Sequence, residues 1–580
     1  MKNKTSFYDI PKYRDLKDVV YKTEEKYSQN TAFIVKKVDD KKNVTYKNIT
    51  YKEVKEDMNA LGTALLSLGL KGKKVAVISP NRYEWVISYL SVVNGVGIIV
   101  PLDRSLPSEE IARLLRRSSA DAVIFDKKYA ESIKKIKDTD NDNNVKYYIC
   151  MDEDVPEFLS YSKLIEKGRK LIEDNSEIYR EYAECEIDPN EMKILLYTSG
   201  TTAMAKAVML SHENIVSDMY GINAVIKVYE NDISLSFLPM HHTLGAIAVW
   251  FLLANGATTA FCDGLKYIQA NLKEYKATVF VTVPLLIENM YKKIMKNIDK
   301  QGKTEKVQKG KEIANALLKI KIDIRRKIFK EIIDNLGGGL RIIVSGAAGL
   351  DKDVAEALND FGIETVQGYG LTETSPVICV ENDKYRKPGT CGFPLKNVEI
   401  EIEDKDEKGV GELKVKGPIV MLGYYEMEEE TKNVLKDEWF YTGDLAYIDE
   451  EGYVHISGRK KDVIVLKNGK NIYPEELEKL IDKLPYVVES LVFGYPDGND
   501  LIVSAKIVIS NDYINDIYPN KSQEEVEELI WKDIKKINMT LSNYKHIKKM
   551  MVTDEPMIKT TTAKIKRFVE IEKIINSKTM

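Results

Sequence analysis

Short apolar runs rich in β-branched residues alternate with helical patterns along most of the chain, and this alternation limits the possible folds more than any other feature. Five such runs are KVAVIS (74–79), DAVIFD (121–126), ILLYTS (194–199), TVFVTVP (278–284) and LRIIVSG (340–346). Continuous apolar runs of this length are typical of strands that helices cover on both faces. The pattern predicts an α/β fold in which sheets and helices form layers.

The character of the sequence changes after about residue 392. Alternating or charged strands such as NVEIEIED and GELKVKG follow, and beyond residue 471 two amphipathic helical patterns flank the apolar run SLVFGY. A single core stops growing at about 250–300 residues, so a chain of 580 residues needs more than one domain. We expect a small β-rich unit after the α/β part, and then a compact α+β tail.

Charge and cysteine usage exclude several classes of protein. Lys and Arg number 86 against 90 Asp and Glu, a net charge of −4, which is too balanced for attraction of the whole molecule to nucleic acid. The five cysteines show no close pairing and favour a reducing compartment over a disulfide framework or a zinc ribbon. The N-terminus is polar and no apolar stretch reaches ~18 residues, so we expect a cytoplasmic protein without a membrane span.

Residues 292–330 are strongly basic, unlike the chain as a whole, with 14 Lys or Arg against four acidic residues. Within them Ile313, Leu317, Ile320, Ile324 and Ile328 recur at spacings of three and four, which predicts an amphipathic helix. We favour a solvated surface helix packed on the core. The alternative is a surface that meets a membrane or receives anionic ligands, which leaves a peripheral membrane contact open.

The stretch YTSGTTAMAKAVML joins a strand to a second apolar run through a loop of small donor residues. The loop contains Thr198, Ser199, Gly200, Thr201 and Thr202, and Lys206 follows it. Hydroxyls, exposed backbone N–H groups and one cation suit a polyphosphate. A Walker loop would need Gly before the lysine, Ser or Thr after it, and a helix; here Ala205 and Ala207 flank Lys206 and a strand follows. The remaining alternative is an ordinary Ser/Thr-rich turn.

Further short segments supply groups that would complete a nucleotide site. QGYGLTETSP (367–376) contains Tyr369, which can stack on a base, the Thr372 hydroxyl, and Glu373, whose carboxylate suits Mg²⁺. WFYTGDL places Asp444 on a turn, where a carboxylate can accept both ribose hydroxyls, although a plain β-turn Asp is the alternative. SGRKKDVI supplies Arg459, and KTTTAKIKR near the C-terminus is Lys-rich, as solvated faces usually are.

In this order and at these separations, the segments resemble the adenylate-forming (AMP-binding) superfamily, from residue 70 to residue 564. The blocks GGGLRIIVSGAAGLD and VPLLIENMY and the insertion after them most resemble long-chain fatty acid:CoA ligases (acyl-CoA synthetases). The resemblance implies a large layered αβαβα adenylation core (1–460, with the β-rich subdomain at about 392–460) and a mobile α+β C-terminal domain (461–580) that pivots at Lys461. It also implies ATP, Mg²⁺ and CoA: a fatty acid becomes an acyl-adenylate with release of pyrophosphate, and transfer to CoA then releases AMP.

The resemblance also implies roles for individual residues. The implied nucleotide-binding residues are Thr198, Ser199, Gly200, Thr201, Thr202, Lys206, Ser345, Gly346, Ala347, Gln367, Gly368, Tyr369, Gly370, Thr372, Asp444, Arg459 and Lys564. Glu373 with Thr198 would bind Mg²⁺, and the implied catalytic residues are Lys564, His242, Thr372 and Glu373. His242, in LPMHHTLG, would lie beside the acyl site with His241 as its bystander.

Departures from the family pattern keep other functions open. The usual G-x-P-K-G around the phosphate-loop lysine is replaced here by Ala203, Ala205 and Ala207, and Ala563 stands where relatives often have Gly. One alternative is an acyl-acyl carrier protein ligase, or a ligase for an aryl or medium-chain acid. Another is a non-catalytic protein that binds nucleotide or acyl ligands. The sequence leaves the acyl chain length and the oligomeric state open.

Overall fold

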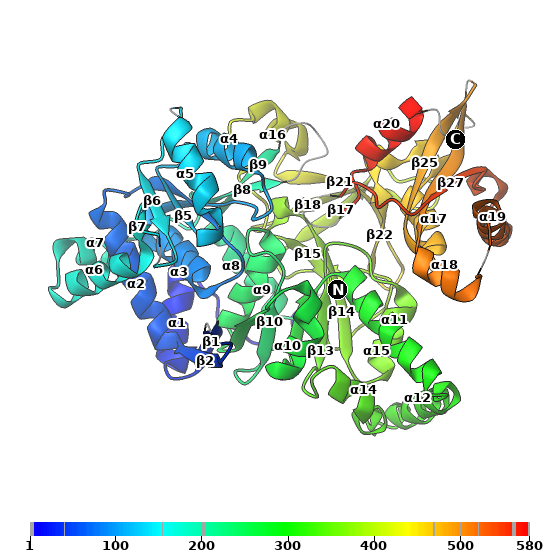
Figure 1. Cartoon of the computed structure of the whole chain (residues 1–580), viewed down its shortest axis with the longest axis horizontal. Coiled ribbons are helices and arrows are strands. Elements are labelled where there is room, and N and C mark those ends of the chain that lie inside the picture. The colour runs from blue at the N-terminus through cyan, green and yellow to red at the C-terminus, as the bar shows by residue number, and fades with distance from the viewer. Residues whose placement is uncertain are drawn as a thin grey trace.

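The computed structural model describes residues 5–39, 41–140, 142–153, 155–198, 205–467, 470–498, 500–519, 521–559 and 564–577. Two large sheets with their helices form the body of the molecule, and the C-terminal residues form a separate lobe at one side (Figure 1). The α/β fold class, with large sheets and an additional C-terminal domain, is confirmed.

The first large sheet has eight strands in the order β19-β9-β8-β4-β3-β5-β6-β7. Their bounds are β3 (Lys73–Ile78), β4 (Gly97–Pro101), β5 (Ala122–Phe125), β6 (Tyr147–Cys150), β7 (Leu159–Ser160), β8 (Met192–Thr198), β9 (Lys206–Ser211) and β19 (Gly423–Tyr424). Strands β8 to β7 of this order run parallel, whereas β9 pairs antiparallel with β8 and forms the hairpin that carries the predicted phosphate loop.

The second large sheet has nine strands in the order β16-β15-β14-β13-β12-β10-β11-β1-β2. Their bounds are β1 (Thr31–Val38), β2 (Val44–Thr50), β10 (Ile233–Ser236), β11 (Thr258–Phe261), β12 (Val279–Thr282), β13 (Ile342–Ser345), β14 (Glu364–Gly370), β15 (Val377–Val380) and β16 (Phe393–Pro394). The strands from β1 to β14 pair in parallel, so their carboxyl ends meet along one edge of the sheet.

Helices pack between and around the two sheets. Their bounds are α1 (Leu16–Tyr27), α2 (Tyr51–Ser67), α3 (Tyr83–Ser91), α4 (Ser108–Ser118), α5 (Ala130–Thr139), α6 (Tyr161–Glu173), α7 (Glu177–Glu184), α8 (His212–Asn223), α9 (Thr243–Leu253), α10 (Ile268–Glu274), α11 (Pro284–Lys300), α12 (Thr304–Lys319), α13 (Arg325–Ile328), α14 (Lys330–Asn335) and α15 (Lys352–Asp360). Helix α9 has almost no polar face, because its segment TLGAIAVWFLL is buried between both sheets (Figure 1).

A smaller antiparallel sheet follows the body, in the order β17-β18-β21-β20 with β22 paired to β21. The bounds are β17 (Glu399–Glu403), β18 (Gly411–Lys416), α16 (Glu428–Val434), β20 (Leu435–Lys436), β21 (Trp439–Ile448) and β22 (Val454–Arg459). Along β21, buried and partly exposed side chains alternate, which is the pattern of a sheet with one face on the core.

The C-terminal lobe contains a three-stranded sheet, a two-stranded ribbon and four helices. The bounds are β23 (Ile464–Val465), β24 (Asn471–Ile472), α17 (Pro474–Ile481), β25 (Val487–Asp497), β26 (Asp500–Ile509), α18 (Asn511–Ile517), α19 (Gln523–Met539), β27 (Lys549–Thr553) and α20 (Arg567–Ser577). The two predicted amphipathic helices correspond to α17 and α19, and SLVFGY lies within β25. This lobe has its own apolar core.

The basic segment 292–330 does not form the single amphipathic helix that its spacing predicts. Helix α12 ends at Lys319, and Lys321 has a φ of 64°, a left-handed conformation that a continuous helix does not tolerate. The chain turns and resumes in the short α13. Ile313, Ile320 and Ile328 are exposed, so the predicted apolar stripe is not simply packed on the core.

None of the helices in the described ranges is both long enough and apolar enough to cross a membrane.

Candidate functional site

The β8–β9 hairpin places the predicted phosphate-binding lysine next to a hydroxyl. Thr198 and Lys206 are register partners at the open end of the hairpin, and the Thr198 hydroxyl donates to the Lys206 carbonyl at 3.3 Å. The other four loop residues named from the sequence, Ser199, Gly200, Thr201 and Thr202, lie outside the described residues. The hairpin therefore fixes both ends of the loop by β pairing.

An aromatic side chain connects Lys206 to the predicted Mg²⁺ ligand. The Lys206 ammonium lies 4.4 Å from the centre of the Tyr424 ring, and the Tyr424 hydroxyl donates to a Glu373 carboxylate oxygen at 2.9 Å. Tyr424 is in place because β19 pairs with β9. Burial and the Glu373 charge raise the pKa of the Tyr424 phenol, so it remains a proton donor. Tyr424 is not among the residues predicted from the sequence, because its segment LGYYE contains no motif that marks this role.

The donors around Lys206 have the chemistry that Mg²⁺ requires. Glu373 lies in the short 3₁₀ helix Thr372–Thr374, where Tyr424 orients its carboxylate, and the Thr198 hydroxyl belongs to the neighbouring hairpin. Carboxylate and hydroxyl oxygens are hard ligands, and Mg²⁺ is usually held by one or two carboxylates together with substrate phosphates. These residues therefore fit an ion that accompanies a polyphosphate.

The predicted ribose carboxylate is held by two partners. Asp444 and Arg459 are register partners on β21 and β22, and they form an ion pair in which the Arg459 Nε lies 2.7 Å from one Asp444 carboxylate oxygen. The Tyr369 hydroxyl donates to the other oxygen at 2.5 Å. Asp444 is only 4% exposed, and burial raises the pKa of its carboxyl while the Arg459 charge lowers it. Tyr369, predicted to stack on a base, thus also orients the carboxylate.

The predicted adenine pocket begins where two parallel strands end side by side. Ser345 on β13 and Gln367 on β14 are register partners. The Gln367 side chain accepts a hydrogen bond from the Leu350 N–H at 2.6 Å and donates to the Thr390 carbonyl at 3.1 Å. Its amide therefore braces two loops. Of the group Gln367 to Gly370, Gln367 is buried, and Gly368, Tyr369 and Gly370 are partly exposed, so these three are the parts available to a ligand.

Two positions at these strand ends need special backbone conditions. A Cβ on Gly370 would lie 1.7 Å from the Pro376 carbonyl oxygen, so no other residue fits there. Ala347 has a φ of 72°, in the left-handed region that favours glycine. Gly346 packs against Leu244 of α9, at 3.1 Å for a built Cβ. The candidate base pocket is thereby in contact with α9, the helix that directly follows His241 and His242. Gly368 has no such restriction beyond a 3.4 Å approach.

Lys564 of the C-terminal lobe lies at the nucleotide side of the site. Its ammonium is close enough to Arg459, Asp444 and Glu373 for their charges to act on it. Desolvation by surrounding atoms and repulsion by Arg459 lower the pKa of Lys564, and the carboxylates oppose this shift. The residue as a whole is exposed. The structure thus brings Lys564 to the residues that the sequence assigned to ATP.

Helix α17 docks the lobe in this position. Lys483, just after α17, pairs with Asp353 of α15 at 2.8 Å. At the start of α17, the Glu475 carboxylate lies against Gly458 of β22, and its charge acts on both Arg459 and Lys564. Glu475 was also missed by the sequence analysis. Lys461, the predicted hinge, lies in the 3₁₀ helix Lys460–Asp462 directly after β22.

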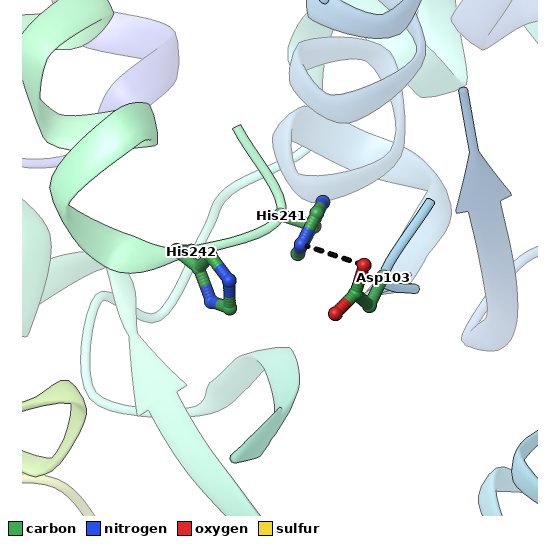
Figure 2. A group of neighbouring side chains, drawn as sticks. All are labelled: Asp103, His241 and His242. Carbon is green, nitrogen blue, oxygen red and sulfur yellow. Dashed lines mark ion pairs between the residues drawn. The ribbon is translucent and has the colours of Figure 1, made fainter. Parts of the chain in front are cut away.

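The opposite side of the site carries two adjacent histidines, of which His241 is buried and His242 partly buried. His242 caps the N-terminus of α9, and burial, Lys564 and Arg104 lower the pKa of its imidazole while Asp103 raises it, with burial the largest effect. Its neighbour His241 is 7% exposed, and burial lowers the pKa of His241 strongly. His241 also faces the Asp103 carboxylate at 3.3 Å (Figure 2). Both imidazoles are therefore uncharged at neutral pH.

An enclosed cavity adjoins His242. It is lined by Tyr89, Pro101, Leu196, Ile215, Met240, His242, Thr243, Ala246 and Ile247. Its volume of about 10 Å³ is room for about one water molecule. The lining is mostly apolar, so the cavity suits hydrocarbon, and side chains must move before a chain of several methylenes can enter.

Fold and site together bring cations, carboxylates and hydroxyls from separate segments close to one another, with a small apolar cavity beside His242. The sequence profile of the AMP-binding enzyme family matches residues 21–425, and that of the AMP-binding enzyme C-terminal domain matches residues 461–573. The chain belongs to the AMP-binding enzyme family, as its motifs predicted.

Curated relatives narrow the comparison. Long-chain-fatty-acid–CoA ligase FadD15 of Mycobacterium tuberculosis is 27% identical, over 91% of this chain and 91% of that protein. The chloroplastic long-chain-fatty-acid–[acyl-carrier-protein] ligase AEE15 of Arabidopsis thaliana is 24% identical, over 97% of this chain and 86% of that protein. Among solved structures, the anthranilate CoA ligase AuaEII superposes with a TM-score of 0.77 at 20% identity, over 99% of each chain. At that identity the structure shows the shared fold.

Proposed function

We propose that this protein is an ATP-dependent, AMP-forming long-chain fatty acid–CoA ligase. The observation that carries the proposal is the convergence of five residues from five separate segments, with an apolar cavity nearby: Lys206, Glu373, Asp444, Arg459 and Lys564. The curated relatives named as long-chain fatty acid ligases support the choice of acid. Mg²⁺, held by Glu373 and Thr198, would neutralise phosphate charge when bound.

In the first reaction a carboxylate oxygen of the acid attacks the α-phosphorus of ATP, and the bond to pyrophosphate breaks. Lys206 faces the β and γ phosphates from the hairpin, and Asp444 with Arg459 holds the ribose. Lys564 contributes positive charge between the attacking carboxylate and the α-phosphate, where both reactants are anionic. In the second reaction the CoA thiol attacks the acyl carbonyl, AMP leaves, and the thiol proton passes to solvent. Most of the catalysis is positioning and charge neutralisation.

The position of the C-terminal lobe suits the first reaction, because Lys564 is at the nucleotide. For the second reaction we propose that residues 461–580 rotate about Lys461 and carry Lys564 away. The contacts that would break include the ion pair of Lys483 with Asp353, and polar contacts of this kind permit domain motion.

Pyrophosphate exchange tests the proposal directly. The full chain is incubated with MgATP, labelled pyrophosphate and a panel of short, medium, long-chain and aryl acids. We expect exchange that depends on a long-chain acid, and acyl-CoA with AMP once CoA is added. Failure of every acid to support exchange would overturn the enzymatic proposal and favour a non-catalytic binding protein.

Acyl carrier protein is the second candidate acceptor, because the relative AEE15 is named for it. The same reaction run with holo-acyl carrier protein in place of CoA separates the two. A thioester formed on the carrier protein at a rate equal to or above that on CoA would replace our first proposal.

We also propose that the basic segment 292–330 contacts an anionic membrane that supplies the acid. Its exposed Ile313, Ile320 and Ile328 lie among many lysines and arginines. Segments that combine exposed apolar side chains with positive charge bind anionic lipid surfaces. Vesicles containing anionic lipid should bind the wild-type protein and bind Ile320→Glu several-fold less. Equal binding by both would exclude the contact.

A further inference from the structure

Three side chains that can ligate metal meet beside the apolar cavity (Figure 2). Asp103 lies in the loop after β4 of the first sheet, whereas His241 and His242 lie between β10 of the second sheet and α9. Each offers one ligand atom, and these atoms all lie within 4.8 Å of one another. The cluster is thus assembled by the packing of the two sheets.

Two nitrogens of this cluster are buried without a hydrogen-bond partner in the described part of the chain, His241 Nε2 and His242 Nε2. His241 Nε2 is 3.3 Å from the Asp103 carboxylate but does not meet the geometry of a hydrogen bond to it. An unsatisfied buried polar atom is destabilising and rare in folded proteins, so two of them at one place indicate a missing partner. A single atom between the three side chains would satisfy both nitrogens.

The donor set selects the kind of ion. Two imidazoles and one carboxylate are the ligands of zinc sites that keep an open position. Imidazole also suits copper, nickel and cobalt, whereas Mg²⁺ prefers six oxygens, so this cluster differs in chemistry from the Glu373 site. The cluster carries one negative charge, and the cations of Arg104 and Lys564 lie nearby and repel a metal ion. Because this repulsion weakens binding, we expect the ion to exchange with solvent.

The distances require only a small adjustment. Zinc bonds of about 2.0–2.2 Å in a tetrahedral arrangement separate neighbouring ligand atoms by about 3.4 Å. The pair of Asp103 and His241 already has this spacing at 3.3 Å. His242 has to move by on the order of 1 Å, and the adjoining cavity leaves space for its ring to turn.

We propose that Asp103, His241 and His242 bind a divalent transition-metal ion of the Zn²⁺ class. Because the ion occupies His242 at the edge of the cavity, it blocks entry of the carboxylic acid, and the enzyme is inhibited by competition with the acid and not with ATP. The binding site stands on the geometry alone; the inhibition also rests on the proposed function.

Metal binding by the full chain without nucleotide is the first test, measured with Zn²⁺ by equilibrium dialysis and with Co²⁺ by its visible absorption. We expect one ion per chain, with affinity reduced at least 10-fold in Asp103→Asn and in His241→Gln. The matched control is His455→Gln, because His455 also faces a carboxylate, Asp449, at 2.9 Å, but on the β-rich sheet. Thermal midpoints establish that each variant is folded, and His241→Asn replaces His241→Gln if the latter is not.

Unchanged affinity in both variants, or an equal loss in His455→Gln, would overturn the site, and so would an absence of Zn²⁺ and Co²⁺ binding. The second test is pyrophosphate exchange with Zn²⁺, in which the KM for the acid should rise several-fold while the KM for ATP stays constant. The opposite pattern would overturn the inhibition. If no acid supports exchange, the proposed function fails, while the dialysis result still decides the metal site.

Discussion

The two sides of the site differ in how their polar groups are held. On the nucleotide side, charges of both signs are already paired: Arg459 with Asp444, and Lys206 with Glu373 through the Tyr424 ring. On the acid side, His241 and His242 are uncharged, and within the described ranges the Nε2 atom of each is buried without a hydrogen-bond partner, next to a nearly closed cavity. The nucleotide side can therefore receive a polyanion with little rearrangement, whereas the acid side must open. We therefore expect the nucleotide side to neutralise phosphate charge and the acid side to determine which acid binds.

The largest expected effect comes from removing the cation that joins the two sides. Lys564→Ala should lower adenylate formation by about 10²–10³-fold, the loss typical of one group that stabilises transition-state charge. Thioester formation from supplied acyl-adenylate should change little, because the lobe has then rotated away. Single-turnover measurements of each half-reaction test both statements. Lys566→Ala, an exposed lysine two residues along, is the matched control. Equal loss in both half-reactions would contradict the assigned role.

The next effect tests the pairing on the nucleotide side. Asp444→Asn keeps the shape of the side chain but removes the charge that holds Arg459 and Tyr369. A charged hydrogen bond contributes about 1.5–3 kcal/mol, so ATP affinity should fall by about 10–100-fold. Calorimetric titration with ATP measures the loss, and Asp449→Asn, an ion-paired aspartate of the same sheet, should leave affinity unchanged. An unaltered ATP affinity in Asp444→Asn would remove Asp444 from the ribose site.

A smaller effect tests the acid side. Ala246 lines the cavity, whereas Ala254 follows the same helix outside it, and each is 8% exposed. Ala246→Leu should reduce kcat/KM for a long-chain acid relative to a shorter one by about 10-fold, because a methylene misfit in an apolar pocket costs about 1–3 kcal/mol. Ala254→Leu overpacks the core to a similar degree without narrowing the cavity. The same change in chain-length preference in both variants would show that the cavity does not hold the acyl chain.

The same contrast explains what the sequence could predict. Lys206, Tyr369, Glu373, Asp444 and Arg459 stand in short motifs whose residue types imply their chemistry, and the structure brings them together. Tyr424 and Glu475 escaped notice because an aromatic residue and a surface acid carry no local signal. Their roles come from the pairing of β19 with β9 and from the docking of α17.

Two other features could not be predicted from the sequence, each for a physical reason. Asp103 meets His241 only because the two large sheets pack together, which no spacing along the chain encodes. The stripe at Ile313 to Ile328 has helical spacing, but α12 ends at Lys319 and the chain turns at Lys321. Spacing reports which residues could share a face, and it does not report whether the helix continues.

The last effect is on stability and not on turnover, and it concerns a carboxyl that braces the nucleotide side. Glu381 is 2% exposed and accepts hydrogen bonds from the Gln367 N–H at 2.9 Å and the Lys387 N–H at 2.7 Å. Burial raises the pKa of Glu381 from 4.5 to about 7, against those hydrogen bonds. The folded protein therefore binds this proton more tightly than the unfolded chain does. The resulting stabilisation is complete below pH 4.5 and is lost as the pH rises through about 7, a change of about 3 kcal/mol.

Glu381→Gln cannot ionise, and one amide edge of the new side chain opposes a backbone N–H. The variant should be less stable than the wild type at about pH 5, and the difference should shrink by about 3 kcal/mol towards pH 8. Denaturant midpoints at several pH values measure this difference in stability. Glu399 is an exposed glutamate of β17, so the difference between Glu399→Gln and the wild type should not change with pH. A constant difference for Glu381→Gln as well would mean that Glu381 is ionised in the folded protein. The nucleotide side would then keep even this buried carboxyl charged, and its difference from the uncharged histidines of the acid side would be larger than we describe.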